Sequence, residues 1–230
     1  MSAHKIRFPG ETDTYRAARD KLLDAEIELR RATEKVAAQR RELPLGGEVP
    51  QDYVFEEITG EYGKGAKRQV RLSQLFEKDK TTLILYNFMY GPKMKRPCPM
   101  CTSIIDSLDG AAPHVAQRVN IAVVAKSPIE RIREFAKERG WRRARLLSSN
   151  ASSYNRDYGG ETDAGDQMPA LNVFVRQDGR TFHSWNTELM FAPSEPGQDF
   201  RHVDTIWPLW NLFDFTPDGR PEGWTPKLSY

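Results

Sequence analysis

The sequence predicts an α/β fold, because apolar runs alternate with helix-like segments in the middle of the chain. Two runs, residues 83–90 and 121–125, are continuously apolar, as in strands that are buried on both faces of a sheet. A helix-like segment follows each run. Residues 102–108 place apolar side chains on one side, and a Ser-Pro pair at 127–128 is typical of a helix start. This alternation predicts a mixed sheet flanked by helices.

The only two cysteines of the chain, Cys98 and Cys101, stand between the first of these strands and its helix. Strand, short loop, C-x-x-C and helix is the order in which a thioredoxin-like fold presents its redox pair. A thiolate is the attacking species in disulfide exchange, and the free N–H groups of a helix N-terminus stabilise it. We therefore expect Cys98 to be the more acidic, attacking thiol and Cys101, one turn into the helix, to be the resolving thiol.

The approach to the cysteines is basic. Lys93, Lys95 and Arg96 precede Cys98 without an acidic neighbour. We expect these charges to favour the thiolate, and we assign Arg96 and Pro97 to the substrate-binding surface. A stabilised thiolate favours the reduced form, which predicts a protein more oxidising than thioredoxin.

Other roles for the cysteine pair remain open. Zinc needs four ligands, and no second C-x-x-C is present. A structural disulfide across two residues would close a very small loop and constrain little. Two inert buried thiols are the third structural alternative. Redox chemistry is the role of the pair that the cysteine spacing favours.

Two further functions compete with disulfide exchange. Cys98 could be the peroxidatic thiol of a peroxide-reducing enzyme, although the usual Pro-x-x-x-Thr-x-x-Cys run is absent. Both thiolates, with His183 or His114, could bind a soft metal such as Cu(I). Neither histidine has ligand spacing to the cysteines.

A second informative stretch lies downstream, where Met168 and Pro169 precede an apolar run at 170–175. A proline directly before a strand is where thioredoxin-like folds place a cis-proline, and cis X–Pro bonds mark constrained turns. We expect the Met168 backbone to face the dithiol and to pair with an extended substrate. An ordinary trans proline is the alternative.

The outer parts of the chain are predicted to be additions to one domain. We divide it into an N-terminal helical extension (1–50), a thioredoxin-like domain (51–190) and an aromatic-rich C-terminal extension (191–230). A long helix is expected from a cap at Thr14 to about Glu42. Its apolar stripe packs either on the domain or against a second helix, as in a homodimer. The stripe consists of Ala18, Leu22, Ala25, Leu29, Ala32 and Val36.

Shorter elements are predicted around the centre. The helix after the cysteines is expected to break at Asp109-Gly110, with a second helix starting at Pro113. Ser73 is expected to cap a short helix over 70–76, and Asp204 one that ends at Leu212. The remaining elements are predicted as a hairpin over 52–66, a helix end at Gly140, a basic loop at 142–145, a strand at 146–148, a helical turn over 154–160, a hairpin turn at Asp178-Gly179 and a return strand at 181–185.

The C-terminal segment is rich in aromatic residues, which form either core or the wall of a pocket. They are Phe200, Trp207, Trp210, Phe213, Phe215 and Trp224.

Composition narrows the class of protein. A net charge of +2 with 29% charged residues argues against a nucleic-acid specialist. No run of about 18 apolar residues exists that would span a membrane, and no secretory h-region is visible, so we expect a cytoplasmic protein. The expected partners are protein or small-molecule thiols and disulfides. No cofactor is expected besides the redox-active disulfide.

Several short runs distributed over the chain carry a family resemblance. They are Arg40–Pro44, Asp52–Phe55, Leu72–Phe76, Tyr86–Pro92, Cys98–Cys101, Phe182–Trp185 and Asp214–Arg220. Together they resemble thioredoxin-like bacterial proteins that are catalogued as a domain of unknown function and labelled predicted dithiol–disulfide oxidoreductases. The resemblance implies a thioredoxin fold with additions at both ends and a dithiol site at Cys98 and Cys101. Thioredoxin itself has a tryptophan where Pro97 stands, so we expect a different partner surface.

Overall fold

The computed structural model describes residues 6–60, 64–77, 79–198 and 201–229. The chain divides into two compact units, Met1–Pro44 and Leu45–Tyr230, which are described separately. No helix among the described residues is long and apolar enough to cross a membrane.

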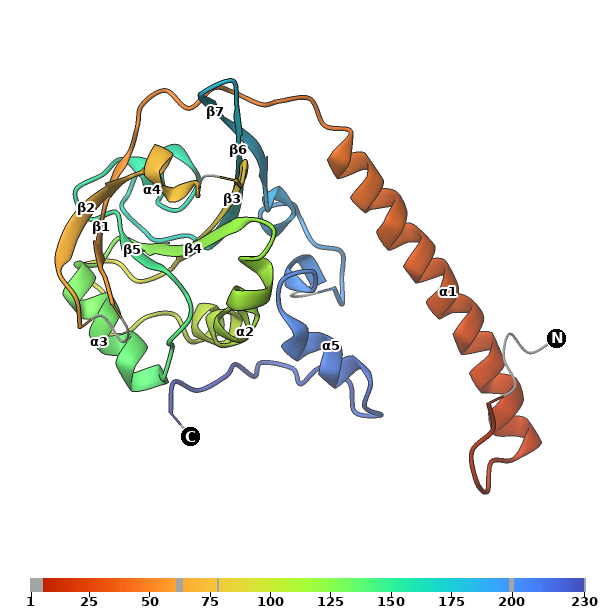
Figure 1. Ribbon diagram of the computed structural model, residues 1–230. Coiled ribbons are helices and arrows are strands. Elements are labelled where there is room, and N and C mark those ends of the chain that lie inside the picture. Colours follow the sequence, from red (N-terminus) through yellow and green to blue (C-terminus); the bar gives the residue numbers. More distant parts are fainter. Residues whose placement is uncertain (1–5, 61–63, 78, 199–200, 230) are drawn as a thin grey trace. The chain divides into compact units, whose positions relative to one another are not determined.

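The first unit is built on helix α1, Asp13–Arg41 (Figure 1). The helix begins one residue after Thr12, whose hydroxyl accepts a hydrogen bond from the Tyr15 N–H at 3.2 Å. The predicted cap at Thr14 is therefore wrong, because Thr14 already lies inside the helix. The predicted end is confirmed, since Glu42 is the C-terminal cap.

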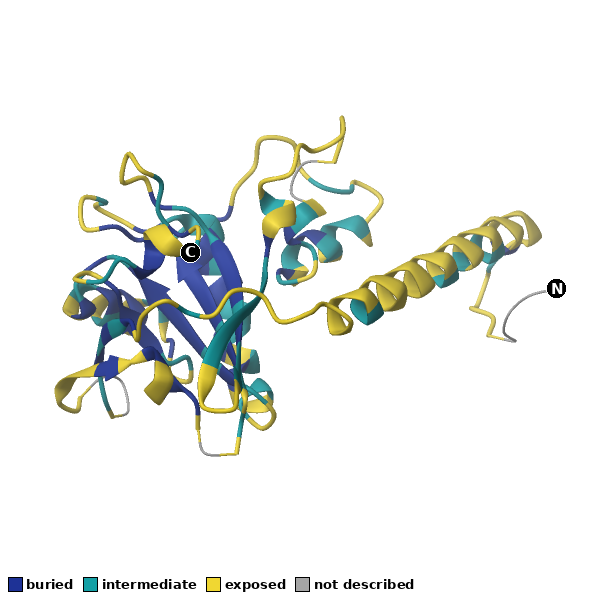
Figure 2. Cartoon of the chain, turned by 90° about the horizontal axis from the view of Figure 1, so that it is seen from above, coloured by how far each residue is buried: buried dark blue, intermediate teal, exposed yellow. Residues whose placement is uncertain are grey.

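The apolar stripe of α1 is exposed to solvent in the structure. Leu22, Leu29 and Val36 are 53%, 67% and 43% exposed, and the only buried residue of the helix is Arg16. Figure 2 shows the helix exposed along most of its length. Its stability therefore rests on helix propensity and on local ion pairs such as Arg16–Asp20 at 3.0 Å.

The second unit contains a seven-stranded mixed sheet of order β2-β1-β5-β4-β3-β6-β7. β3, β4 and β5 are parallel to one another, and the other neighbours pair antiparallel. This arrangement, with helices against the sheet, is the thioredoxin-like fold that the sequence predicts. The strands are β1 (Val54–Ile58), β2 (Lys67–Arg71), β3 (Thr82–Phe88), β4 (Asn120–Ala125), β5 (Leu146–Ser148), β6 (Ala170–Gln177) and β7 (Arg180–Asn186).

The predicted helices are present with changed boundaries, except for the separate helix expected from Pro113, and the short helix expected over 70–76 is a 3₁₀ turn. The turn at Asp178-Gly179 is confirmed, with positive φ values of 52° and 76°. The helices are α2 (Pro99–Val115), α3 (Ile129–Arg139), α4 (Tyr154–Asp157) and α5 (Pro208–Asp214), and short 3₁₀ turns lie at Leu72–Leu75, Glu188–Met190 and Arg201–Val203.

Helix α2 continues through the point where a break was expected. The buried Asp109 carboxylate accepts three hydrogen bonds, from the N–H groups of Arg142, Arg143 and Ala144, at 2.8–3.0 Å. Its side chain therefore anchors the loop before β5 and leaves its own helix intact. Pro113 lies inside α2 and starts no second helix.

Two predicted N-terminal caps serve other purposes, and one predicted helix end is confirmed. The Ser127 hydroxyl donates to the Gly91 carbonyl at 3.0 Å, and Pro128 occupies the cap position of α3. Ser73 lies within its 3₁₀ turn and binds the Asp52 carboxylate through both its N–H and its hydroxyl. The predicted stop at Gly140 is confirmed, with a φ of 78°.

Two apolar clusters cover the two faces of the sheet, because successive strand side chains point in opposite directions. Tyr86 and Phe88 belong to one cluster, with α2, α3 and the C-terminal segment; Leu83 and Leu85 belong to the other. Figure 2 shows the central strands of the sheet as the most deeply buried part of this unit. The cysteine-bearing helix therefore lies over the first cluster.

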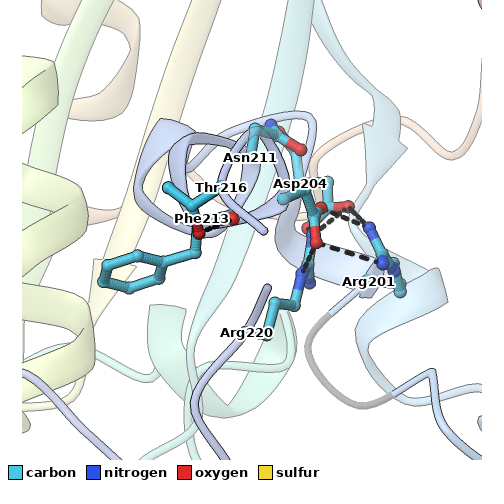
Figure 3. Close-up of polar contacts among 7 residues, drawn as sticks. Arg201, Asp204, Asn211, Phe213, Thr216 and Arg220 are labelled. Carbon is cyan, nitrogen blue, oxygen red and sulfur yellow. Dashed lines mark hydrogen bonds and ion pairs between the residues drawn. The ribbon is translucent and has the colours of Figure 1, made fainter. Parts of the chain in front are cut away.

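The C-terminal aromatics contribute to the first cluster. Trp207 and Trp210 are each 1% exposed and pack edge to face, with ring centroids 5.4 Å apart. Phe200 lies outside the described residues. Asp204 does not cap a helix. Trp207 has the cap position of α5, while Asp204 binds Arg220 at 2.8 Å in a cluster with Arg201 and Asp214 (Figure 3).

Candidate dithiol site

Cys98 occupies the N-terminal cap position of helix α2, after the loop that follows the carboxyl end of strand β3. Its N–H donates to the Met89 carbonyl at 3.0 Å, and its own carbonyl accepts hydrogen bonds from the N–H and hydroxyl of Thr102. Pro99 is the first helical residue, where its missing N–H is not needed. These contacts hold the half-buried thiol at the open N-terminus of the helix.

Cys101 lies one turn further along α2 and is 2% exposed. It packs in the cluster that contains Tyr86, Ile104 and Ile105. Both cysteines are free, and their side chains lie within hydrogen-bonding distance of each other. An accessible thiol thus lies next to a buried one.

The electrostatics separate the two thiols. A hydrogen bond from the Cys101 thiol, together with smaller contributions from the N–H groups of Cys101 and Met100, lowers the pKa of the Cys98 thiol to about 6 against the opposing effect of burial. The hydrogen bond to Cys98 and burial raise the pKa of Cys101 well above its ordinary value. Near neutral pH the pair therefore carries its negative charge on Cys98.

The basic residues before Cys98 do not lower its pKa as the sequence predicts. The Arg96 guanidinium forms an ion pair with Glu138 and lies 5.1 Å over the Phe135 ring. Lys93 and Lys95 are exposed. None of the three contributes to the low pKa of Cys98, which comes from Cys101 and the helix N-terminus. The predicted acidity of Cys98 thus has another cause.

The remaining predicted binding residues lie around the same edge of the sheet. The register of β3 with β6 pairs Asn87 with Ala170, so the strands bring Met168 and Pro169 beside the segment that leads to the cysteines. The predicted cis-proline is wrong, since the peptide bonds between described residues are all trans. The Met168 N–H donates to the Gly160 carbonyl at 3.0 Å.

The loop between β3 and the cysteines packs tightly. Pro97 is buried, unlike the exposed Arg96 beside it. A Cβ atom on Gly91 would lie 2.8 Å from the Gln167 Cγ, so this position needs glycine. The loop that carries the cysteines is therefore fixed against the segment before β6.

Tyr86 is a site residue that sequence reasoning missed. It is 0% exposed, and its hydroxyl makes no hydrogen bond of ordinary geometry with any described residue. It lies close enough to Cys101 to lower the pKa of that thiol. The available signal was a tyrosine inside an apolar strand, because a buried hydroxyl normally needs a partner.

The histidines of the metal alternative do not join the cysteines. His183 Nε2 forms a hydrogen bond with Asn172 Oδ1 at 2.9 Å, and its ring packs on Tyr158 and Phe174. His114 is exposed near the far end of α2. Over the described part of the chain, no group of three or more His, Cys, Asp or Glu side chains could hold a metal ion.

Sequence comparison places nearly the whole chain in one family. The profile of a family described as bacterial protein of unknown function, DUF899, matches residues 2–230. No curated protein matches the chain. The family description names no reaction, so the chemistry must come from the residues themselves.

Three of the solved structures that match this chain are named as a thioredoxin peroxidase, a peroxidoxin and a thioredoxin. Thioredoxin peroxidase I of Plasmodium yoelii is 18% identical, with 80% of this chain and 100% of that chain covered and a TM-score of 0.48. Peroxidoxin BcpB of Mycobacterium tuberculosis is 22% identical, with 71% of this chain and 94% of that chain covered and a TM-score of 0.41. An exposed lipoprotein thioredoxin of Streptococcus pneumoniae is 12% identical, with 68% of this chain and 98% of that chain covered and a TM-score of 0.42.

Proposed function

The chain belongs to the DUF899 family of bacterial proteins of unknown function, and we propose that it is a thiol–disulfide oxidoreductase. Cys98 and Cys101 are its dithiol/disulfide couple. The observation that carries the proposal is the asymmetry of the pair: Cys98 is partly exposed with a pKa of about 6, while Cys101 is buried with a raised pKa. One thiolate is thus ready to attack at neutral pH, and a protected thiol stands beside it.

The reaction has two exchange steps. The Cys98 thiolate attacks one sulfur of a substrate disulfide, forming a mixed disulfide and releasing the other sulfur as a thiolate. Cys101 then loses its proton to solvent, and its thiolate attacks the Cys98 sulfur. The Cys98–Cys101 disulfide forms and the second substrate thiolate leaves. The substrate gains two electrons and the protein loses two, and the reverse sequence oxidises a dithiol.

The direction in the cell depends on the reduction potential. A thiolate that is stabilised at neutral pH favours the reduced protein. We therefore expect a midpoint above about −270 mV, the value typical of thioredoxin. The stabilisation comes from Cys101 and from the helix N-terminus, so it is independent of the basic approach.

The test is a redox titration in glutathione buffers, followed by mass measurement and thiol labelling. We expect a reversible loss of two hydrogen masses with a single defined midpoint. Cys98→Ser and Cys101→Ser should each abolish this loss. If the wild-type protein forms no intramolecular disulfide at any glutathione poise, the proposal fails.

A peroxidase and a soft-metal protein remain the alternatives, and the same preparation separates them. The Thr102 hydroxyl donates to the Cys98 carbonyl at 2.9 Å, so it is committed to the backbone and is not a donor beside the thiolate. Peroxide consumption that is lost in Cys98→Ser would favour the peroxidase. Stoichiometric copper after anaerobic purification would favour metal binding.

The proposed partners follow from the chemistry. They are protein or small-molecule disulfides and thiols that reach Cys98 past the exposed Arg96 and the edge formed by Met168 and Pro169. We propose no cofactor besides the redox-active disulfide, and a cytoplasmic location. A homodimer through α1 stays a proposal, which the exposed stripe of that helix supports.

A further inference from the structure

We propose that the Tyr86 hydroxyl is the hydrogen-bond donor that stabilises the Cys101 thiolate when this cysteine resolves the mixed disulfide. The inference rests on the proposed function and assigns the second exchange step to a residue outside the C-x-x-C motif. It starts from the position of Tyr86 on β3, in the same apolar cluster as Cys101 of the helix that carries both cysteines.

The geometry singles out this side chain. Tyr86 is 0% exposed and shares an apolar cluster with Cys101, so water cannot satisfy its hydroxyl. No described residue forms an ordinary hydrogen bond with that hydroxyl, although it lies beside the Cys101 thiol. A buried hydroxyl normally needs a partner, and the Cys101 sulfur is the polar group that lies next to this one. A function at Cys101 explains why a tyrosine occupies a site that phenylalanine would fill.

Tyr86 acts as a donor and not as a base. Burial raises the pKa of its hydroxyl well above 10, and the neighbouring cysteines raise it further. The hydroxyl therefore keeps its proton at any physiological pH. A neutral hydroxyl facing a thiolate can only donate.

The donor matters most in the mixed disulfide. In the resting dithiol, the hydrogen bond to Cys98 is the largest cause that raises the pKa of Cys101. This cause disappears once Cys98 is bonded to substrate sulfur. Burial then remains as the factor that opposes the Cys101 thiolate, and Tyr86 and the Met89 backbone amide remain as the factors that favour it.

Few titratable groups affect the Cys101 thiol. Among the described residues, Cys98 and Tyr86 are the titratable groups that act on its pKa. On α2 itself, Asp106 pairs with Arg139 of α3 and accepts a hydrogen bond from the Trp141 indole, which commits that carboxylate elsewhere. The single hydroxyl is therefore the only side-chain donor available to the buried thiolate within the described part of the chain.

The experiment uses the full chain and an aromatic disulfide whose released thiolate is coloured. Stopped-flow mixing with the reduced protein should give two phases: one thiolate is released as Cys98 attacks, and a second as Cys101 resolves. Tyr86→Phe removes only the hydroxyl. We expect the second phase to slow about tenfold at pH 7, as for loss of one hydrogen bond to a charged group, with the first phase unchanged. The pH midpoint of the second phase should rise by about one unit.

Tyr154→Phe is the matched control. Tyr154 is also 0% exposed with a hydroxyl that lacks an ordinary hydrogen bond to any described residue, but it packs in the other apolar cluster, away from the cysteines. This variant should leave both phases and both pH midpoints at the wild-type values. The first phase reports folding in each variant, because an unfolded chain loses the low pKa of Cys98.

The possible outcomes separate the two proposals. A selective slowing of the second phase in Tyr86→Phe, with a raised midpoint, supports the role of the hydroxyl. Unchanged kinetics in Tyr86→Phe, or equal slowing in both tyrosine variants, overturns it while leaving the dithiol couple intact. Absence of a second phase in the wild-type protein overturns the proposed function itself.

Discussion

The indole N–H of Trp207 donates a hydrogen bond to the Ser103 hydroxyl at 3.0 Å, which ties the C-terminal segment to the helix that carries both cysteines. The two residues are 104 positions apart in the sequence. We expect Trp207→Phe, which loses this bond and part of the packing, to lower the free energy of unfolding by about 1–3 kcal/mol in urea titrations. Trp224→Phe is the control, because Trp224 is 38% exposed. Equal losses in the two variants would contradict a special role for Trp207.

The acidity of Cys98 should depend on Cys101 and not on Arg96. The rate of Cys98 alkylation is expected to rise with a pH midpoint near 6. Cys101→Ala removes the thiol that donates to Cys98, so the midpoint should rise by at least about one unit. Arg96→Gln should leave it in place, because this guanidinium is engaged by Glu138. A midpoint near 8.5 in the wild-type protein would show an unperturbed thiol.

The stability of the reduced protein should depend on pH through Cys98. Its pKa is about 6 when folded, and an unperturbed thiol in the unfolded chain has a pKa of about 8.5, so between these limits the unfolded chain binds more protons. Stability therefore rises with pH across this window, with a slope of at most about 1.4 kcal/mol per pH unit, which screening reduces because Cys98 is partly exposed. Above pH 9 the raised pKa of Cys101 acts in the opposite sense. Urea titrations under reductant should show this slope, and Cys98→Ser should lack it.

Two glycines should respond to alanine in opposite ways. A Cβ atom on Gly160 would lie 2.2 Å from Asn87 Nδ2, so Gly160→Ala should lower the free energy of unfolding by about 1–3 kcal/mol. Gly110 lies within α2, and a Cβ atom added there would meet no atom within 4 Å beyond its neighbours in the helix. Gly110→Ala should therefore raise the free energy of unfolding by up to about 1 kcal/mol. Adding Asn87→Ala to Gly160→Ala should restore part of the loss. Additive effects in that double mutant would exclude the clash.

The exposed stripe on α1 predicts self-association through a second copy of this helix. Its apolar residues recur at alternating spacings of four and three, as in paired helices. Sedimentation velocity should show a dimer that Leu22→Glu with Leu29→Glu converts to a monomer. Lys21→Glu with Glu28→Lys is a control that also alters exposed positions of α1. A wild-type monomer at high protein concentration would exclude this pairing.

Much of the central fold could be predicted from the sequence, because its signals are local. Apolar runs predict β3 and β4, and the cysteine spacing predicts the start of α2. The positive φ values that end α3 and turn the β6–β7 hairpin fall on Gly140 and on the Asp178-Gly179 pair, which are residue types expected at such positions. Such features depend on neighbours in the sequence.

The parts that could not be predicted depend on distant partners. Asp109 resembles a helix breaker until the N–H groups before β5 are seen to bind its carboxylate. Arg96 resembles an activating charge until Glu138, from another helix, engages it. The position of Tyr86 beneath Cys101 likewise follows from how α2 lies on the sheet, which the sequence pattern of β3 alone does not specify.

The packing of Trp207 against the dithiol helix has a consequence for synthesis on the ribosome. At roughly 5–20 residues per second, the 104 residues that separate Trp207 from Ser103 take about 5–20 s to translate. Cys98 and Cys101 therefore emerge well before the tryptophans that complete the core behind them. During that interval the cluster that buries Cys101 lacks Trp207 and Trp210, so part of the packing around the resolving thiol forms only when the C-terminal segment docks.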